Sequence, residues 1–257
     1  MEPILTVKHL SIIFTRYSRG LARTELTAVR DLSLTVEPGR VVSVIGASGS
    51  GKSLLAHAIF QLLPRNARVS GELLYGGAPL TPERARALRG REISLIPQGV
   101  TYLDPMMKVG PQVRRGRRDE DSRARCREVL ARYGLGPEVE ELYPFELSGG
   151  MARRVLIACA VMDAPRLIVA DEPTPGLDVR AAGRVLSHFR ELADGGAGVL
   201  FITHDLELAL TVADTLVVMK GGQTVDQLPA ARFRSGAGLT HPYTRALWRA
   251  MPGNEFL

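Results

Sequence analysis

The sequence predicts an α/β protein with a mostly parallel sheet, an antiparallel β edge subdomain and an inserted helical subdomain. Short β-branched runs alternate with helical patterns, and a glycine-rich loop joins one such run to a helix. A polar, arginine-rich stretch with helical spacing interrupts this alternation. We therefore expect residues 1–257 to form one domain, with a helical insertion at about 100–160 and a C-terminal tail at about 228–257.

Composition is that of a soluble globular chain, with 45% hydrophobic and 23% charged residues. No apolar run reaches the roughly 18 residues that a membrane helix needs, and we expect neither a span nor a secretory signal. Cys126 and Cys159 lack metal-ligand spacing, and we expect no disulfide between them. These features favour the cytoplasm or the cytoplasmic face of the cell membrane.

The net charge of +6 raises the question of nucleic-acid binding. The basic residues are dispersed, and their one dense cluster, Arg114–Arg118, runs directly into the acidic stretch Asp119–Asp121. A mixed cluster of this kind is typical of a solvated surface, and no aromatic residues are interleaved to stack on bases. We expect no nucleic-acid partner.

The first half of the chain is expected to contain strands, a loop and one helix. Alternating or β-branched runs predict strands at Ile4–Leu10, Asp31–Val36, Val41–Ile45, Val69–Leu74 and Glu92–Ile96. A polar loop is expected at Thr15–Thr24, between the first two strands. Helical spacing over Leu54–Leu63 predicts a helix that stops at Pro64.

The second half continues the alternation after the arginine-rich stretch. Val155–Met162 is expected to be a buried helix, and Leu167–Ala170 and Val199–Thr203 are expected to be buried strands. Thr215–Met219 and Gln223–Asp226 flank two glycines and predict a pair of strands.

A phosphate-binding loop of the pattern G-x-x-x-x-G-K-[ST] follows the strand at Val41–Ile45 and opens a helix. It consists of Gly46, Ala47, Ser48, Gly49, Ser50, Gly51, Lys52 and Ser53. The glycines allow backbone N–H groups to surround an anion, and the helix directs its positive end at the same anion. Lys52 adds a charge for the β- and γ-phosphates, and the Ser53 hydroxyl can ligate Mg²⁺. The fold class is therefore a P-loop NTPase core.

Two carboxylates, Asp171 and Glu172, end the apolar strand that begins at Leu167. Ligands bind at the carboxyl ends of strands in open α/β sheets. Asp171 is placed to hold Mg²⁺, and Glu172 is the candidate general base for an attacking water. His204 ends the next apolar strand and would lie beside the γ-phosphate if the two strands are neighbours. Gln98 follows a further strand and can contact Mg²⁺ or orient water.

A second candidate anion site opens the helix that contains Val155. Ser148 is a natural N-cap, and Gly149 and Gly150 would expose backbone N–H groups at a positive helix end. Such a site would serve a head-to-tail dimer by closing on nucleotide held by the partner chain.

The order of these motifs resembles the nucleotide-binding subunits of ATP-binding-cassette (ABC) transporters over nearly the whole chain, with Leu147–Gly150 as its most specific signature. The resemblance implies two such subunits with two ATPs and Mg²⁺ between them. Ser148, Gly149 and Gly150 would contact the partner's ATP, and Asp178 would lie at the dimer interface. His204 would support Glu172, and Gln98 would sense Mg²⁺. Phe14 would stack on adenine, with Tyr17 as a rival.

Further partners are also implied by the resemblance: two membrane permease subunits and, indirectly, an extracytoplasmic solute-binding protein. The segment His241–Leu247 resembles the oligopeptide, dipeptide and nickel importer branch, as does Met151 after the signature. The stretches Pro97–Pro105 and Thr174–Asp178 look closer to nickel and metallophore members, which favours nickel or a metal chelate over small peptides as cargo.

Three alternatives stay open. One is a non-transport ABC ATPase acting on nucleic acid or the ribosome, although no long coiled coil or second cassette is visible. Another is an exporter ATPase. The last, a catalytically inactive binding module, fits poorly with the presence of Lys52, Asp171, Glu172 and His204.

Overall fold

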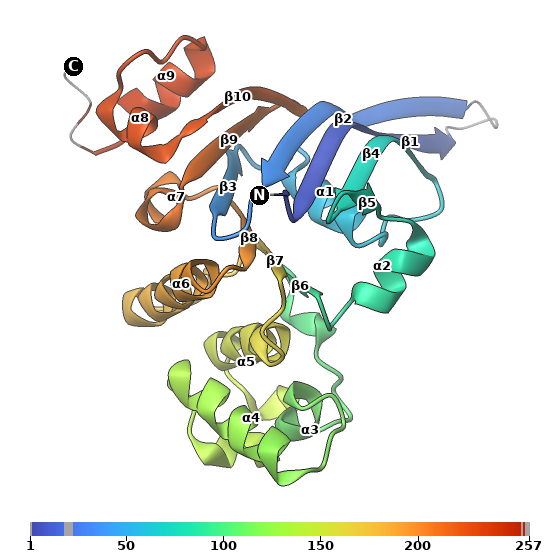
Figure 1. The fold of residues 1–257 in the computed structure, drawn as a ribbon, viewed down its shortest axis with the longest axis vertical. Coiled ribbons are helices and arrows are strands. Elements are labelled where there is room, and N and C mark those ends of the chain that lie inside the picture. Colours follow the sequence, from blue (N-terminus) through green and yellow to red (C-terminus); the bar gives the residue numbers. More distant parts are fainter. Residues whose placement is uncertain (1, 18–22, 253, 255–257) are drawn as a thin grey trace.

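The computed structural model describes residues 2–17, 23–252 and 254, and it is built around a twisted central sheet (Figure 1). In this part of the chain, the sheet has the strand order β10-β9-β3-β8-β7-β6. Its strands are β3 (Val41–Gly46), β6 (Ile93–Ile96), β7 (Leu167–Asp171), β8 (Gly198–Thr203), β9 (Thr215–Lys220) and β10 (Gln223–Pro229). All neighbouring pairs are parallel except β9 and β10. The predicted mostly parallel sheet is confirmed.

An antiparallel sheet with the order β2-β1-β4-β5 lies beside the central sheet. It consists of β1 (Leu5–Tyr17), β2 (Arg23–Val36), β4 (Ala67–Tyr75) and β5 (Ala78–Pro79). The predicted β edge is confirmed. The loop expected at Thr15–Thr24 is wrong at both ends, since Thr15 pairs with Glu25 and Arg16 pairs with Thr24 in two long strands. Its middle, residues 18–22, lies outside the described residues. Pairing satisfies the backbone groups of these polar segments without burying their side chains, which a hydropathy pattern does not reveal.

Helices cover the central sheet and the sheet edge. They are α1 (Lys52–Ile59), α2 (Pro82–Leu88), α6 (Val179–Asp194), α7 (Leu206–Val212), α8 (Ala230–Ser235) and α9 (Pro242–Arg249). In α1, Leu55 and Ile59 are buried in a core shared by both sheets. The helix ends well before Pro64, because Gln61 adopts a left-handed conformation with φ 50°.

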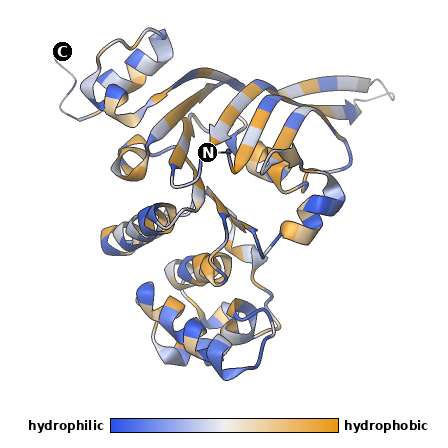
Figure 2. Ribbon diagram, in the orientation of Figure 1, coloured by the Kyte–Doolittle hydropathy of each residue, from blue (hydrophilic) through white to orange (hydrophobic). Residues whose placement is uncertain are grey.

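A helical segment follows β6 and packs below the sheet in Figure 1. It contains α3 (Val109–Val113), α4 (Glu120–Arg132) and α5 (Gly149–Val161), with 3₁₀ turns at Val100–Tyr102, Pro137–Glu141 and Pro144–Glu146. Figure 2 shows that α4 is largely hydrophilic, whereas the central strands are mostly hydrophobic. The Asp119 side chain begins α4 by accepting a hydrogen bond from Ser122 N at 2.8 Å. No helix in the described ranges is long and apolar enough to cross a bilayer.

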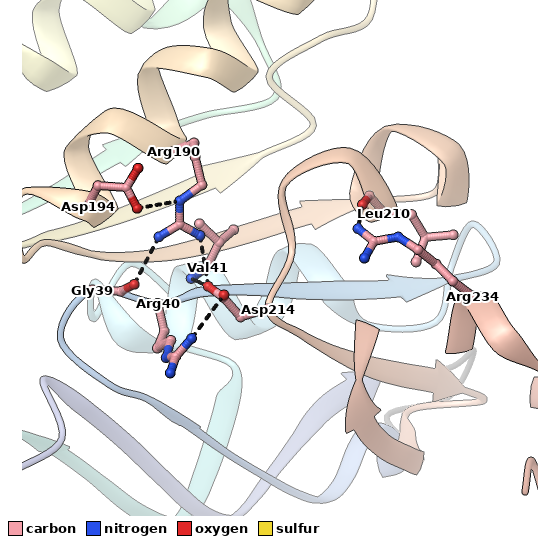
Figure 3. Close-up of polar contacts among 8 residues, drawn as sticks. All are labelled: Gly39, Arg40, Val41, Arg190, Asp194, Leu210, Asp214 and Arg234. Atoms are coloured by element: carbon pink, nitrogen blue, oxygen red, sulfur yellow. Dashed lines mark hydrogen bonds and ion pairs between the residues drawn. The ribbon is translucent and has the colours of Figure 1, made fainter. Parts of the chain in front are cut away.

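An ionic cluster anchors the amino end of β3, opposite the glycine-rich loop (Figure 3). Asp214, just before β9, accepts from Val41 N at 2.8 Å and pairs with Arg40 at 3.1 Å and Arg190 of α6 at 2.8 Å. Arg190 also pairs with Asp194 at 2.9 Å. In the same figure, Arg234 of α8 donates to the carbonyl of Leu210 at α7. These contacts fix α6 against the sheet and α8 against α7.

The strand order decides where the polar motifs meet. Because β3, β8, β7 and β6 are parallel neighbours, the residues after their carboxyl ends share one edge of the sheet. Those residues are the glycine-rich loop, His204, Glu172 and Gln98.

Candidate functional site

The glycine-rich loop needs glycine for both backbone angles and space. Gly49 and Gly51 have φ values of 78° and 92°, which side chains with a Cβ rarely adopt. A Cβ on Gly51 would lie 2.9 Å from the carbonyl oxygen of Ala28, and one on Gly46 would lie 2.3 Å from that of Met219. The loop therefore has a tight turn that leads straight into α1 at Lys52.

Lys52 is buried, and its ammonium lies within the loop. Nζ donates to the carbonyl oxygens of Gly46 at 2.7 Å and Ala47 at 3.0 Å. Burial lowers the pKa of Lys52, and the carboxylates of Glu172 and Asp171 oppose this shift. The lysine thus places a positive charge between the loop and the two carboxylates.

Ser53 and Asp171 form a pair of oxygen ligands below the loop. Ser53 Oγ donates to Asp171 Oδ1 at 3.1 Å. Asp171 is only 3% exposed, and its burial raises the pKa of its carboxyl, while the Ser53 hydrogen bond lowers it. A buried carboxylate beside a hydroxyl is a donor set suited to a hard cation such as Mg²⁺.

Glu172 has a strained backbone and a firmly held carboxylate. Its φ of 49° lies in the left-handed region, which is unusual for a glutamate. Glu172 Oε1 lies 2.7 Å from Nδ1 of His204 and accepts from the His204 amide at 3.0 Å. Thr203 Oγ1 donates to Oε2 at 3.3 Å. The carboxylate is therefore oriented, while the His204 side chain stays 62% exposed.

A cavity of about 810 Å³ adjoins the glycine-rich loop. Lys52, Gln98, Glu172 and His204 all line it, so the structure brings these four predicted residues together. A further wall comes from Leu26–Ala28 of β2. The cavity is large enough for a nucleotide-sized ligand.

Phe14, predicted to stack on adenine, is not among the described residues that line this cavity. Phe14 lies on β1 opposite Leu26 of β2, and it packs against the core shared by the two sheets. Leu26, 43% exposed, lines the cavity instead. Tyr17 is the last residue of β1, and its side chain lies outside the described part of the structure.

Ser148, Gly149 and Gly150 begin α5 away from this cavity. Ser148 Oγ accepts from Met151 N at 3.2 Å, which confirms the predicted N-cap. A Cβ on Gly150 would lie 3.2 Å from the carbonyl of Gly176, so this helix start adjoins the loop before α6. None of the three residues lines the cavity at Lys52 in the described parts of the chain.

Asp178 caps α6 in that same loop. Its side chain accepts from Ala181 N at 2.8 Å, and this hydrogen bond is the main cause that lowers the pKa of the carboxyl. The next residue, Val179, is 90% exposed. Ser148, Gly150, Asp178 and Val179 thus lie around one exposed region at the starts of α5 and α6.

Sequence reasoning missed two residues that contact Glu172. Thr203 ends the strand predicted at Val199–Thr203, and its place directly before His204 could have indicated the contact. Arg153 was also missed: its Nη1 donates to the carbonyls of Glu172 at 3.3 Å and Pro97 at 3.2 Å. The available signal was a pair of charged residues, Arg153 and Arg154, in a helix whose other residues are apolar or glycine.

Comparison with known proteins gives consistent matches. The sequence profile of the family described as ABC transporter matches residues 29–175. A protein of Brucella melitensis, provisionally named a peptide import ATP-binding protein, is 35% identical over 98% of this chain and 78% of its own length. The oligopeptide transport ATP-binding protein OppD of Lactococcus lactis subsp. cremoris is 35% identical over 99% of this chain and 77% of its own.

Solved structures agree with this match. A bacterial ABC transporter cassette solved as a dimer is 25% identical, with a TM-score of 0.77 over 88% of this chain and 98% of that one. The same cassette has been solved in a post-hydrolysis state bound to ADP and Pi. The likeness extends to nearly all of that chain.

Proposed function

Because the chain belongs to the ABC transporter family as an ATP-hydrolysing, ATP-binding subunit, we propose that it powers the import of small peptides through separate membrane permease subunits. The observation that carries the mechanism is the gathering of Lys52, Glu172 and His204 around one cavity. The names of the relatives support the choice of peptide. Nickel, which the sequence favoured, has no such support.

ATP would place its phosphates on Gly46–Ser53, with the loop N–H groups and Lys52 Nζ on the β- and γ-phosphate oxygens. Ser53 and Asp171 would hold Mg²⁺, with Gln98 nearby, because their oxygens suit a hard cation. When bound, Mg²⁺ neutralises charge that develops on the phosphates. The β2 wall at Leu26 and the β1 residue Phe14 are the candidates beside adenine.

Glu172 would accept the proton of the attacking water at its carboxylate. Thr203 and the His204 amide hold that carboxylate in one orientation, so that little reorganisation accompanies the reaction. The imidazole of His204 contacts Oε1 through Nδ1, and His204 lines the cavity in which the γ-phosphate would lie. The two adjacent carboxylates would then have different tasks: Asp171 would bind Mg²⁺, and Glu172 would act on the attacking water.

The working unit would be a head-to-tail pair of ATP-binding subunits, which a second copy of this chain can supply. Ser148, Gly149 and Gly150 form a helix start that would suit an anion, and none of them lines the chain's own cavity among the described residues. Beside them, Val179 is an apolar side chain left 90% exposed. A partner seated there would bring its phosphates to Ser148 and bury Val179 near Asp178.

The permease contact would lie between the central sheet and the helical segment. A groove of about 340 Å³ is lined there by Pro97, Tyr102, Arg115 and Cys159, among others. Tyr102 and Met106 are 58% and 85% exposed just after Gln98. A helix of a permease would bury these apolar groups and hold the subunit at the cytoplasmic face of the membrane.

Reconstitution with the cognate permeases and solute-binding protein tests the proposed function. ATP-dependent uptake of a radiolabelled peptide library into liposomes is the expected result, and Glu172→Gln subunits should give none. Uptake of a nickel chelate but not of peptide would show that the cargo is the chelate. Stimulation of ATP hydrolysis by nucleic acid, or efflux of cargo, would contradict the importer assignment.

A further inference from the structure

Arg153 is a buried cation that links three predicted motifs. It lies in the first half of α5, the helix that Ser148 caps, and it is 9% exposed. Its Nη1 donates to the carbonyl oxygen of Pro97 at 3.2 Å, directly before Gln98. The same nitrogen donates to the carbonyl oxygen of Glu172 at 3.3 Å. One guanidinium therefore bridges α5, the Gln98 loop and the Glu172 peptide.

Stability alone does not account for this arginine. Its Nε is buried without a hydrogen-bond partner among the residues that the structure describes. Burial lowers the pKa of Arg153, although the Glu172 and Asp171 carboxylates oppose that shift. A buried charge with an unmade hydrogen bond is costly, and an apolar side chain of similar size is often at least as stable. Its place beside the Glu172 peptide is consistent with a role in ATP hydrolysis.

The peptide that Arg153 contacts is under strain. Glu172 adopts a φ of 49°, a left-handed conformation in which the Cβ of a residue other than glycine crowds the backbone. Such a conformation persists when surrounding contacts determine it. Ile202 O accepts from Glu172 N at 2.9 Å, and Arg153 donates to Glu172 O. The two contacts fix the peptide groups on both sides of the Glu172 Cα.

We propose that Arg153 is a positioning residue for ATP hydrolysis, which holds the Glu172 backbone and the start of the Gln98 loop against α5. The inference rests on the proposed role of Glu172 as the base. Ser148 caps α5, and Gly149 and Gly150 begin it. The orientation of the Glu172 carboxylate therefore depends on the position of the helix that carries these three residues. Contact with a partner's nucleotide at the helix start is then mechanically linked to the base of the same chain.

Arg153→Met tests this role, since it keeps the volume and removes the charge and both hydrogen bonds. We expect kcat for ATP to fall about ten- to hundredfold, as for a misplacement of reacting groups by about 1 Å. KM for ATP should stay within about twofold, because Lys52 and the glycine-rich loop are untouched. Arg125→Met is the matched control: Arg125 also donates to a main-chain carbonyl at α5, Met162 O at 2.9 Å, but at the far end of the helix. We expect this control to keep its kcat.

Three results would overturn the inference. They are a kcat of Arg153→Met near that of the unchanged chain, a rise in KM with kcat unchanged, or an equal loss of kcat in Arg125→Met. If Arg153→Met does not fold, Arg153→Lys decides, because an ammonium lacks the planar fork of guanidinium. A lowered kcat in folded Arg153→Lys supports the role, and an unchanged kcat rejects it.

Glu172→Gln, assayed in parallel, separates this inference from the proposed function. Lost turnover in Glu172→Gln with normal turnover in Arg153→Met rejects only the role of Arg153. Normal turnover in Glu172→Gln rejects the base itself.

Discussion

Glu172 and Asp171 are adjacent carboxylates with different surroundings. Asp171 ends β7 and accepts from the Ser53 hydroxyl, whereas Glu172 turns into a left-handed conformation and faces Thr203 and His204. The strained residue is the one that we propose as the general base. Strain of this kind persists where surrounding contacts determine the backbone, and it is concentrated at active sites.

Replacing Glu172 with Gln tests its proposed role as the general base. The amide keeps the shape and can still accept from Thr203, but it cannot take a proton. We expect kcat for ATP hydrolysis to fall about a hundredfold or more, which is within the usual contribution of a general base. ATP binding, measured by fluorescence of a nucleotide analogue, should persist. Glu207→Gln, at an exposed glutamate of α7, should match the unchanged chain.

The glycine-rich loop and the α4–α6 contact are features of whole elements. In the loop, Gly51 combines a φ of 92° with a close approach to β2, so two elements depend on the missing Cβ. Between α4 and α6, the Tyr133 hydroxyl shares a buried hydrogen bond with Nδ1 of His188, and Arg132 pairs with Glu191. The first feature shapes the proposed phosphate site, and the second ties the helical segment to α6.

Gly51→Ala should impair nucleotide binding through the backbone. A Cβ there would lie 2.9 Å from Ala28 O in a left-handed conformation, at a cost of about 1–2 kcal/mol from the backbone alone. We expect ATP affinity to drop about tenfold or more and the melting temperature to fall. Gly183→Ala is the control, because Gly183 lies in α6 and a Cβ added there would meet no atom of the described residues within 4 Å. Alanine there should leave affinity unchanged and raise stability by up to about 1 kcal/mol. Equal effects of the two changes would contradict the account.

Because His188 is buried, we expect the free energy of unfolding to depend on pH. Burial is the main cause that lowers the pKa of His188 from 6.5 to about 4. Since the unfolded chain takes up the proton at higher pH than the folded chain, stability is complete above about pH 6.5 and falls as pH drops toward 4. The loss is at most about 3 kcal/mol, at about 1.4 kcal/mol per pKa unit. Denaturant unfolding at pH 7 and pH 5 should show this slope, and His188→Leu should flatten it; an unchanged slope in His188→Leu would count against the assignment.

Sequence patterns predicted the elements where periodicity and chemistry agree. The buried strands β3, β7 and β8 and the N-cap at Ser148 appear where expected, because apolar runs and capping residues are local signals. The polar end of the β1–β2 pair was missed, since strand pairing at Thr15–Glu25 leaves little mark on hydropathy. The contacts of Arg153 could not be predicted, because they join α5 to residues far away in sequence.

At the scale of the whole molecule, the two motifs that we propose as halves of a nucleotide site lie apart in one chain. Lys52 and Glu172 line one cavity, whereas Ser148 and Gly150 adjoin Gly176 near Asp178. The sequence shows that both motifs are present. The fold shows that, among the described residues, they do not line the same cavity in one chain. We propose that two chains complete each site.

Mixing two inactive variants tests this claim most directly. Lys52→Ala breaks the phosphate loop and Ser148→Arg blocks the helix start, so each variant alone should hydrolyse little ATP. A head-to-tail pair formed from one chain of each kind contains one intact composite site. Equal mixing should therefore restore ATPase activity to about a quarter of the unchanged level, since half the pairs are mixed and each has one working site. No recovery on mixing folded variants would contradict the account and place the complete site within a single chain.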